Sequence, residues 1–372
     1  MGRRLGVVVV GQTPPPYGGQ ATMIKRIVEA SYDGVDVHHV RMMFSREMNE
    51  LGRVSLRKLL LLPGLIGRVA WTRLRTRASV LYFPPSHLDR VTIYRDLAVL
   101  LSTRWMFAKT VFQFHSGGIS DVYPALPRWL RWLARRAYFG ADLGIRASEF
   151  APPDPSVLRA RREEIIPYGI ENAPAQLRRR APALRTQGRP VVLFAGVLRE
   201  SKGVLVLLDA CSELIQRGMA FELQLMGHFG SGEFEAEVRE KVRSQGLEPS
   251  VRFLGVLTGS AFDEAFARAS IFCFPTFFES EALPIVVLHA LQFSLPVVAS
   301  RWRGIPSQVR DGWNGYLVPV RDAAAVADRL AKLLLDPGLR AEMGERGRRD
   351  YEQRFSLEAF RCRMQLAFDS LR

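Results

Sequence analysis

Short apolar runs alternate along this chain with longer segments in which apolar residues recur at helical spacing. The runs cover residues 5–10, 80–83, 110–114, 191–194, 221–226, 271–274 and 296–299. Alternation of this type predicts parallel sheets whose strands are joined by helical crossovers. The fold class that we expect is therefore α/β, with Rossmann-like, doubly wound domains.

A segment rich in proline and arginine separates two series of these runs. Residues 152–190 contain an arginine triplet at 178–180 and show little apolar periodicity, which is typical of a connection between domains. A length of 372 residues suits two domains of ordinary size. We expect a first domain over residues 1–175, a linker over 176–189 and a second domain over 190–350. Open sheets of this kind bind ligands beyond the carboxyl ends of their strands, so the expected site is the cleft between the domains.

The composition is that of a folded protein, with 48% hydrophobic and 24% charged residues. The first apolar run is too short for a signal peptide core or a membrane span. Cys211, Cys273 and Cys362 are widely spaced among apolar neighbours, so we expect neither a disulfide framework nor a zinc site. These features predict a cytoplasmic protein in a reducing compartment.

The net charge of +15 is unevenly distributed. Residues 1–189 contain 30 Lys and Arg but 14 Asp and Glu, whereas the rest of the chain is close to neutral. A one-sided basic field attracts an anionic partner such as phosphate, nucleic acid or an acidic membrane. The alternative is an arginine-rich composition that serves only solubility.

Two carboxylates lie between a buried run and an apolar helical segment in residues 275–300. Glu279 and Glu281 follow the run that ends at Phe274, and Pro284 opens the helix. Backbone N–H groups at a helix start can bind phosphate, and a carboxylate can accept hydrogen bonds from sugar hydroxyls. The alternative is that one Glu only favours the helix start electrostatically.

This segment resembles the signature of group 1, or family 4, of the GT-B retaining glycosyltransferases. The family pattern E-G-L-P-x-x-x-L-E-A is matched by Glu281, by Leu283 with Pro284, and by Ala290, and the following strand is matched by residues 295–299. The resemblance implies that Glu281 contacts the donor sugar and that the helix start contributes to donor binding through Glu279, Leu283, Pro284 and Ile285. His289 stands where the family has its second Glu, which holds the nucleotide ribose. Imidazole can bond a hydroxyl, but it cannot accept two bonds as a carboxylate does.

Residues 194–210 resemble the family block F-x-G-R-L-x-x-x-K-G. Gly196, Leu198, Lys202 and Gly203 match, whereas Val197 replaces the arginine. In the family the two cations neutralise the donor diphosphate, so the resemblance implies this role for Lys202. Arg199 could supply the missing cation from another direction. The alternative for Lys202 alone is a hydrated lysine at a helix start.

The first domain matches the family more weakly. A loop with Gly18 and Gly19 follows the first run and resembles a glycine-rich loop of the family near the donor and acceptor. His115 follows the run 110–114, where many members carry a histidine that faces the donor sugar. Tyr168 lies in a segment similar to the interdomain motif V-I-P-N-G-I-D. The resemblance also implies that a helix within residues 351–372 crosses back to the first domain.

Two basic segments of the first domain predict contact with an anionic membrane. Residues 51–79 combine seven cations with an apolar stretch and lack acidic residues. A similar patch is formed by Trp129, Arg131, Trp132, Arg135 and Arg136. Each segment could instead be a helix that packs on a sheet with hydrated arginines. No nucleic-acid-binding module is recognisable, so we do not expect a nucleic acid partner.

Together these features predict a retaining glycosyltransferase with a nucleotide-sugar donor and a glycan or lipid-linked acceptor. The catalytic residues that we expect are Lys202, Glu281 and His115. No Asp-x-Asp triplet occurs, so we expect no metal and no other cofactor. Two alternatives stay open. One is a catalytically weak relative that binds a nucleotide sugar or glycan, and the other is a sugar-nucleotide epimerase.

Overall fold

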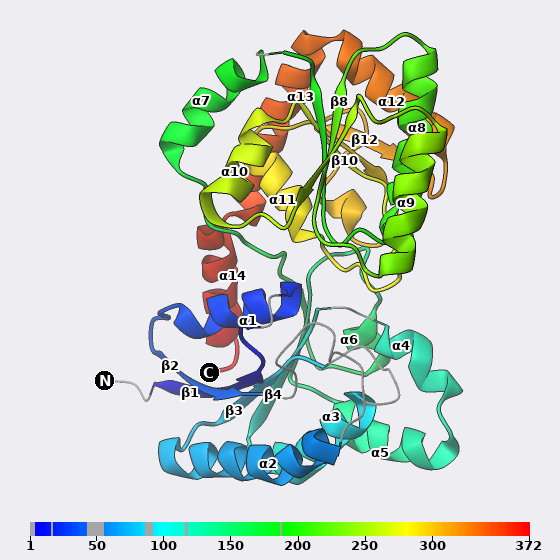
Figure 1. The fold of residues 1–372 in the computed structure, drawn as a ribbon. Coiled ribbons are helices and arrows are strands. Elements are labelled where there is room, and N and C mark those ends of the chain that lie inside the picture. The colour runs from blue at the N-terminus through cyan, green and yellow to red at the C-terminus, as the bar shows by residue number, and fades with distance from the viewer. Residues whose placement is uncertain (1–3, 16–17, 43–55, 86–91, 116–117, 187) are drawn as a thin grey trace. The chain divides into compact units, whose positions relative to one another are not determined.

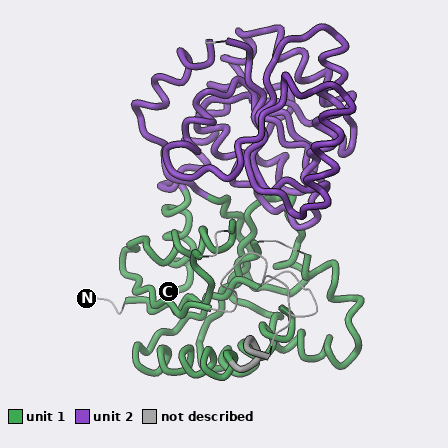
Figure 2. Tube along the Cα trace, in the orientation of Figure 1, with its two compact units in different colours: residues 1–168, 360–372 green, residues 169–359 purple. Residues whose placement is uncertain are grey.

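The computed structural model describes residues 4–15, 18–42, 56–85, 92–115, 118–186 and 188–372, with side chains in the helix that begins at residue 56 described from residue 61. The chain divides into two compact units (Figure 2). Unit 1 comprises Met1–Tyr168 and Phe360–Arg372, and unit 2 comprises Gly169–Ala359. The chain therefore passes from one unit to the other twice.

Unit 1 is a parallel sheet with helices on both faces. In its described part the strand order is β2-β1-β3-β4-β5-β6. The strands are β1 (Leu5–Gly11), β2 (Val35–Arg41), β3 (Val80–Phe83), β4 (Lys109–Phe114), β5 (Leu143–Arg146) and β6 (Glu163–Ile165). Residues 7–10 of β1 are fully buried, as a central strand covered on both faces requires.

The helices of unit 1 form two layers, which Figure 1 shows above and below its sheet. One layer contains α1 (Gly19–Glu29) and α14 (Leu357–Asp369), and the other contains α2 (Leu56–Thr76), α3 (Thr92–Thr103) and α5 (Arg128–Tyr138). Short helices α4 (Ile119–Val122) and α6 (Asp154–Val157) follow β4 and β5. The reversal of strand order beside β1 places the β1–β2 crossover helix, α1, on the face opposite to the later crossover helices α2, α3 and α5.

Unit 2 repeats this architecture, with the strand order β12-β11-β10-β7-β8-β9. Its strands are β7 (Val191–Ala195), β8 (Glu222–Met226), β9 (Val251–Gly255), β10 (Ile271–Phe274), β11 (Val297–Ser300) and β12 (Gly315–Val318). Its helices are α7 (Ala175–Arg185), α8 (Val204–Gln216), α9 (Gly232–Ser244), α10 (Gly259–Arg268), α11 (Ile285–Gln292), α12 (Ala323–Leu335) and α13 (Pro337–Asp350). The predicted α/β class with two Rossmann-like sheets is confirmed.

The structure differs from the predicted linker at 176–189. This stretch contains most of α7, which packs on α10 within unit 2. The guanidinium of Arg185 donates hydrogen bonds to the carbonyl oxygens of Ala267, Phe293 and Ser294. Ala181 is the buried residue of this helix, so an apolar stripe could not have revealed it in the sequence.

The C-terminal segment enters unit 1 through α14. Ile170 and Leu357 are hydrogen-bonded where the two connecting segments pass each other in unit 2, with Leu357 N–H donating to the carbonyl of Ile170 at 2.9 Å. Further along α14, the rings of Tyr32 and Phe368 lie 5.0 Å apart between centroids, and Lys109 Nζ donates to the carbonyl of Leu371 at 2.6 Å. No helix in the described residues has the length and hydropathy needed to cross a membrane.

Candidate active site

Two chemically important loops of unit 2 begin at neighbouring strand ends. β7 leads into a short 3-10 turn, Glu200–Lys202, and β10 leads into residues 275–284. The two strands are paired in parallel, with Ile271 opposite Val192. Their carboxyl ends therefore lie side by side, and segments 79 residues apart in the sequence meet at one edge of the sheet.

Lys202 and Glu281 form an ion pair at this edge. Lys202 Nζ donates to Glu281 Oε2, and the two side chains are only 14% and 10% exposed. Thr276 Oγ1 donates to the same carboxylate oxygen at 3.4 Å. The ammonium also lies 4.4 Å from the ring centroid of Phe278. Ion pairing, hydrogen bonding and the aromatic face thus hold Lys202 in a single place.

Gly203 allows these two loops to approach each other. Its φ is +79°, and a Cβ built on it would lie 2.1 Å from the carbonyl oxygen of Pro275. The Phe277 N–H donates to the carbonyl of Ser201 at 2.8 Å across the same contact. A side chain at position 203 would separate the backbones that position Lys202 and Glu281.

Arg199 and Glu200 on the first loop and Glu279 on the second are exposed charges. The guanidinium carbon of Arg199 lies 5.7 Å from the ring centroid of Phe278, so Arg199 and Lys202 share one aromatic neighbour. Glu279 lines a cavity of about 620 Å³ within unit 2. The other lining residues are Glu200, Ser201, Phe277, Phe278, Ser280, Trp302, Val320 and Arg321. Carboxylates beside aromatic rings are suited to binding hydroxyl-rich ligands.

The start of α11 completes this edge of unit 2. Leu283 and Pro284 are buried and Ile285 is partly exposed. The carbonyl of Pro284 accepts a hydrogen bond from the buried Gln308 side chain at 3.0 Å, which fixes the helix start. No side chain caps the first N–H groups among the described residues. These N–H groups are suited to binding phosphate oxygens.

Gly196 lies at the end of β7 and is tightly held by β8. Its N–H donates to the carbonyl of Met226 at 2.9 Å. A Cβ on Gly227, whose φ is +144°, would lie 1.8 Å from the Gly196 carbonyl oxygen. Close packing of the two strand ends therefore determines the path of the chain toward Lys202.

His289 lies on α11 against aromatic rings of α10. Its ring centroid is 4.9 Å from that of Phe262 and 5.7 Å from that of Phe266. The Gln292 side chain accepts from the Ala173 N–H through Oε1, so its Nε2 faces His289 Nδ1 at 2.8 Å and donates to it. The neutral imidazole therefore carries its proton on Nε2. The role of His289 in ribose binding stays a prediction.

In unit 1, His115 is held by a reciprocal contact with Tyr168. The tyrosine hydroxyl donates to the His115 carbonyl at 3.0 Å, and His115 Nδ1 lies 3.0 Å from the same hydroxyl oxygen. Because that hydroxyl has one proton, Nδ1–H is the donor and Nε2 is an acceptor. Nε2 is buried and has no hydrogen-bond partner in the described structure. Burial lowers the pKa of His115 to about 3, which keeps the imidazole neutral.

Asp154 is a site-supporting residue that sequence reasoning missed. This fully buried carboxylate accepts from the N–H groups of Gly118 and Ser120 at 2.9 and 2.6 Å. It thereby anchors the chain shortly after His115. Its sequence context, between Pro153 and Pro155 at the start of α6, contains no signal for this long-range contact. Thr276, only five residues before Glu281, was missed as well.

The glycine-rich loop of unit 1 is only partly described. Gly18 is the N-cap of α1 in an extended conformation, and its carbonyl accepts from the Thr22 N–H at 2.9 Å; Gly19 is the first helical residue. Residues 16–17 before it and 116–117 after His115 lie outside the described residues. The donor-binding roles of both glycines stay predictions. No cluster of three or more His, Cys, Asp or Glu side chains within the described ranges could hold a metal ion.

Comparison with solved structures shows the class of fold. Anabaena HepE, solved in complex with UDP, has 18% sequence identity and a TM-score of 0.73, covering 98% of this chain and 100% of its own. Sucrose-phosphate synthase from Thermosynechococcus elongatus has 17% identity and a TM-score of 0.74, covering 99% of both chains. The fold shared with these proteins, two parallel α/β units in one chain, is GT-B.

Sequence comparison finds relatives of unit 2. The model of glycosyl transferases group 1 matches residues 176–350, just under half of the chain. The amylovoran biosynthesis glycosyltransferase AmsK of Erwinia amylovora is 31% identical over 38% of this chain and 35% of the relative. The D-inositol 3-phosphate glycosyltransferase of Corynebacterium jeikeium is 34% identical over 55% of this chain and 44% of the relative. The chain thus spans less than half the length of these curated relatives.

Proposed function

We propose that this protein is a retaining glycosyltransferase that acts in the cytoplasm. It transfers a sugar from a nucleotide-diphosphate donor to a hydroxyl of a glycan or lipid-linked acceptor, in cell-surface polysaccharide or glycolipid synthesis. The Lys202–Glu281 pair at the adjoining ends of β7 and β10 carries this proposal. The UDP complex of HepE and the name of AmsK support the choice of donor and pathway class.

Lys202 stabilises the leaving diphosphate. Negative charge grows on the phosphate oxygen as the glycosidic bond breaks, and a fixed cation lowers the energy of that charge. An ammonium has three N–H donors, of which Glu281 takes one, so the others can reach phosphate oxygens. The N–H groups at the start of α11 add a second, uncharged source of stabilisation.

Glu281 orients the donor sugar. Lys202 and Thr276 both contact Oε2, which leaves Oε1 to accept a hydrogen bond from a sugar hydroxyl. This contact fixes the anomeric carbon relative to the cations of the same unit. The role of His115 toward the donor sugar stays a prediction; its Nε2 is an acceptor in a neutral ring.

The configuration at the anomeric carbon is retained if the acceptor attacks this carbon from the same face from which the diphosphate departs. The bond from the anomeric carbon to the phosphate oxygen breaks, and the bond to the acceptor oxygen forms on the same side. The acceptor proton passes to the departing phosphate oxygen, so atoms and charge balance without a protein nucleophile. We propose no metal in this reaction.

The test is donor hydrolysis and transfer with a panel of UDP-, GDP- and ADP-sugars. Lys202→Met and Glu281→Gln should each lower kcat by about two to three orders of magnitude, the range seen for loss of a preorganised electrostatic contact. Lys241→Met is the matched control, since Lys241 pairs with Asp209 at 2.7 Å on α8 and α9 of the same unit. Wild-type rates in both site variants would refute the site.

A second candidate is a GT-B relative that binds the donor without transferring the sugar. Val197 in the position of the family arginine and the aromatic surroundings of His289 favour it. Calorimetry that shows donor binding, with no product from a broad acceptor panel, would select this function. Incubation with donor alone, analysed for an epimer, would separately detect an epimerase.

A further inference from the structure

In unit 1, the helices α2, α3 and α5 cover one face of the sheet. The surface that they turn away from the sheet differs from the rest of the unit in its exposed apolar and basic side chains. α3 packs against both α2 and α5, so the three helices form a single layer, which Figure 1 shows along one face of the sheet. We call its outward surface the α2–α3–α5 face. Its large exposed apolar side chains are Leu61, Trp71, Leu74, Tyr94, Trp105, Trp129 and Trp132.

Tryptophan is concentrated on this face. Four of the six tryptophans of the chain lie there, and Trp71 and Trp105 are 66% and 77% exposed. On α5, Trp129 and Trp132 are more than half exposed, whereas Leu130 and Ala134 pack into the core. Moving rings of this size from water into an apolar environment is favourable. A rigid ring with one N–H group is suited to the headgroup layer of a lipid membrane.

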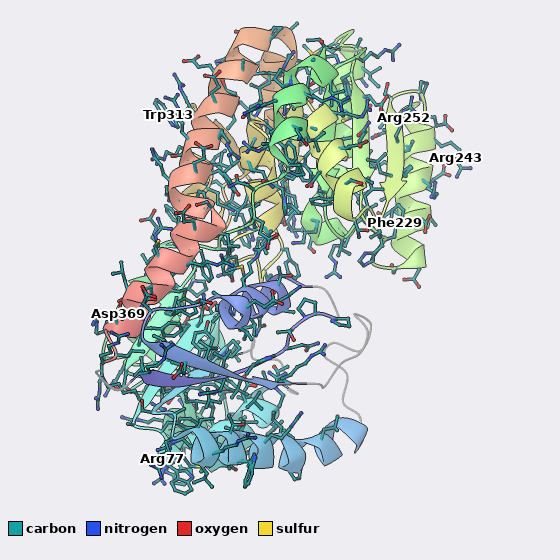
Figure 3. All side chains as sticks on the ribbon, turned by 90° about the vertical axis from the view of Figure 1, so that its left-hand side faces the viewer. Arg77, Phe229, Arg243, Arg252, Trp313 and Asp369 are labelled. Atoms are coloured by element: carbon teal, nitrogen blue, oxygen red, sulfur yellow. The ribbon has the colours of Figure 1, made fainter. Side chains whose placement is uncertain are left out.

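The same face is rich in cations. Its exposed arginines are Arg68, Arg75, Arg77, Arg128, Arg135 and Arg136, and Figure 3 shows Arg77 just beyond the end of α2. The acidic residue within the three helices, Asp96, is fully buried and paired with Arg95 at 2.6 Å. In the opposite layer, α1 and α14 contain both acidic and basic residues. The positive charge of this layer is therefore not offset by exposed acids on its own helices.

Arginine and tryptophan also contact each other on this face. The Arg136 guanidinium carbon lies 4.2 Å from the ring centroid of Trp132, one helical turn away. This contact keeps an apolar ring and a cation next to each other on the exposed side of α5. A lipid headgroup layer accepts both groups together, because phosphate binds the cation while the acyl boundary takes the ring.

We propose that the α2–α3–α5 face is a docking surface for an anionic membrane. Membrane docking goes beyond the transfer reaction proposed above and does not depend on it. The sequence-based expectation named residues 51–79 and 129–136. Of these, 51–55 lie outside the described residues, and the structure adds Tyr94 and Trp105 between the two segments.

Charge alone would fit a nucleic acid as well as a membrane. Nucleic acid binding uses cations along a groove, with rings that stack on bases. Here the exposed residues include Leu61 and Leu74, which neither stack nor bond, on a layer of packed helices. Aliphatic side chains beside tryptophan and arginine gain free energy from a lipid interface and not from phosphates alone.

The test uses the full chain and vesicles of phosphatidylcholine, with and without an equal share of phosphatidylglycerol. We expect co-sedimentation with the anionic vesicles at low salt, release at high salt and weak binding to neutral vesicles. The triple variant Arg128→Gln/Arg135→Gln/Arg136→Gln should lower the partition coefficient about a hundredfold, roughly fivefold for each cation. Trp129→Ser/Trp132→Ser should lower it about tenfold and reduce the blue shift of tryptophan emission, of which Trp71 and Trp105 keep a part.

Trp313→Ser is the matched control. Trp313, labelled in Figure 3, belongs to unit 2 and is 44% exposed. The Arg346 guanidinium carbon lies 4.2 Å from its ring centroid, the same distance as in the Trp132–Arg136 pair. This variant should bind as the wild type does, and thermal unfolding should show that every variant is folded. Equal binding by all variants, or binding to duplex DNA or RNA in place of vesicles, would overturn the proposal.

Discussion

Burial of a neutral His115 should make unit 1 less stable in mild acid. The imidazole is 6% exposed, and burial lowers its pKa from 6.5 to about 3. Between these two values the unfolded chain binds a proton that the folded chain does not. The free energy of unfolding therefore falls as the pH decreases from about 6.5 toward about 3, and this contribution is fully present above pH 6.5.

The size of the effect follows from the two pKa values. At about pH 5 the unfolded imidazole is mostly protonated and the folded one is not, which corresponds to about 2 kcal/mol relative to about pH 7.5. His115→Asn removes the titration, while the amide N–H can still donate to Tyr168 as Nδ1–H does. The loss of stability in acid should therefore be about 2 kcal/mol smaller in this variant.

Urea unfolding followed by far-UV circular dichroism measures the effect at both pH values. His228→Asn is the control for the substitution itself, since His228 is an exposed imidazole of unit 2. Equal losses of stability in the wild type and in His115→Asn between the two pH values would refute the prediction that His115 is buried in its neutral form.

Two further predictions concern unit 2. Gly203→Ala should lower Tm and raise KM for the donor, because it combines a φ of +79° with a Cβ placed 2.1 Å from the Pro275 carbonyl oxygen. Gly246→Ala is the control, since Gly246 has a φ of +66° and open space where its Cβ would lie, so this variant should lose only about 1–2 kcal/mol of stability through backbone strain. An equal loss of stability in the two variants would contradict the steric contact between position 203 and Pro275. Arg185→Met should destabilise unit 2 by about 2–3 kcal/mol through the loss of its hydrogen bonds to three carbonyls. Arg180→Met, on an exposed part of α7, should be neutral in the same denaturation assay, and a similar cost would show that the anchor is not specific.

The sequence by itself determined the α/β class and the two segments that meet at the candidate site. Buried parallel strands require unbroken apolar runs, and these runs are local, so they could be recognised around β1, β7 and β10. Glu281 and Lys202 could be singled out because they directly follow such runs within recognisable patterns.

Only the tertiary structure decided which of these local features act together. The pairing of β7 with β10 places Lys202 on Glu281, and strand order is set by packing across the whole sheet. Helix α7 could not be predicted because Arg185 anchors it through carbonyls far away in the sequence. The neighbours of His289 and the single layer of α2, α3 and α5 depend on the same long-range packing. Periodicity indicates which side of a helix is buried, whereas the fold alone decides what each side faces.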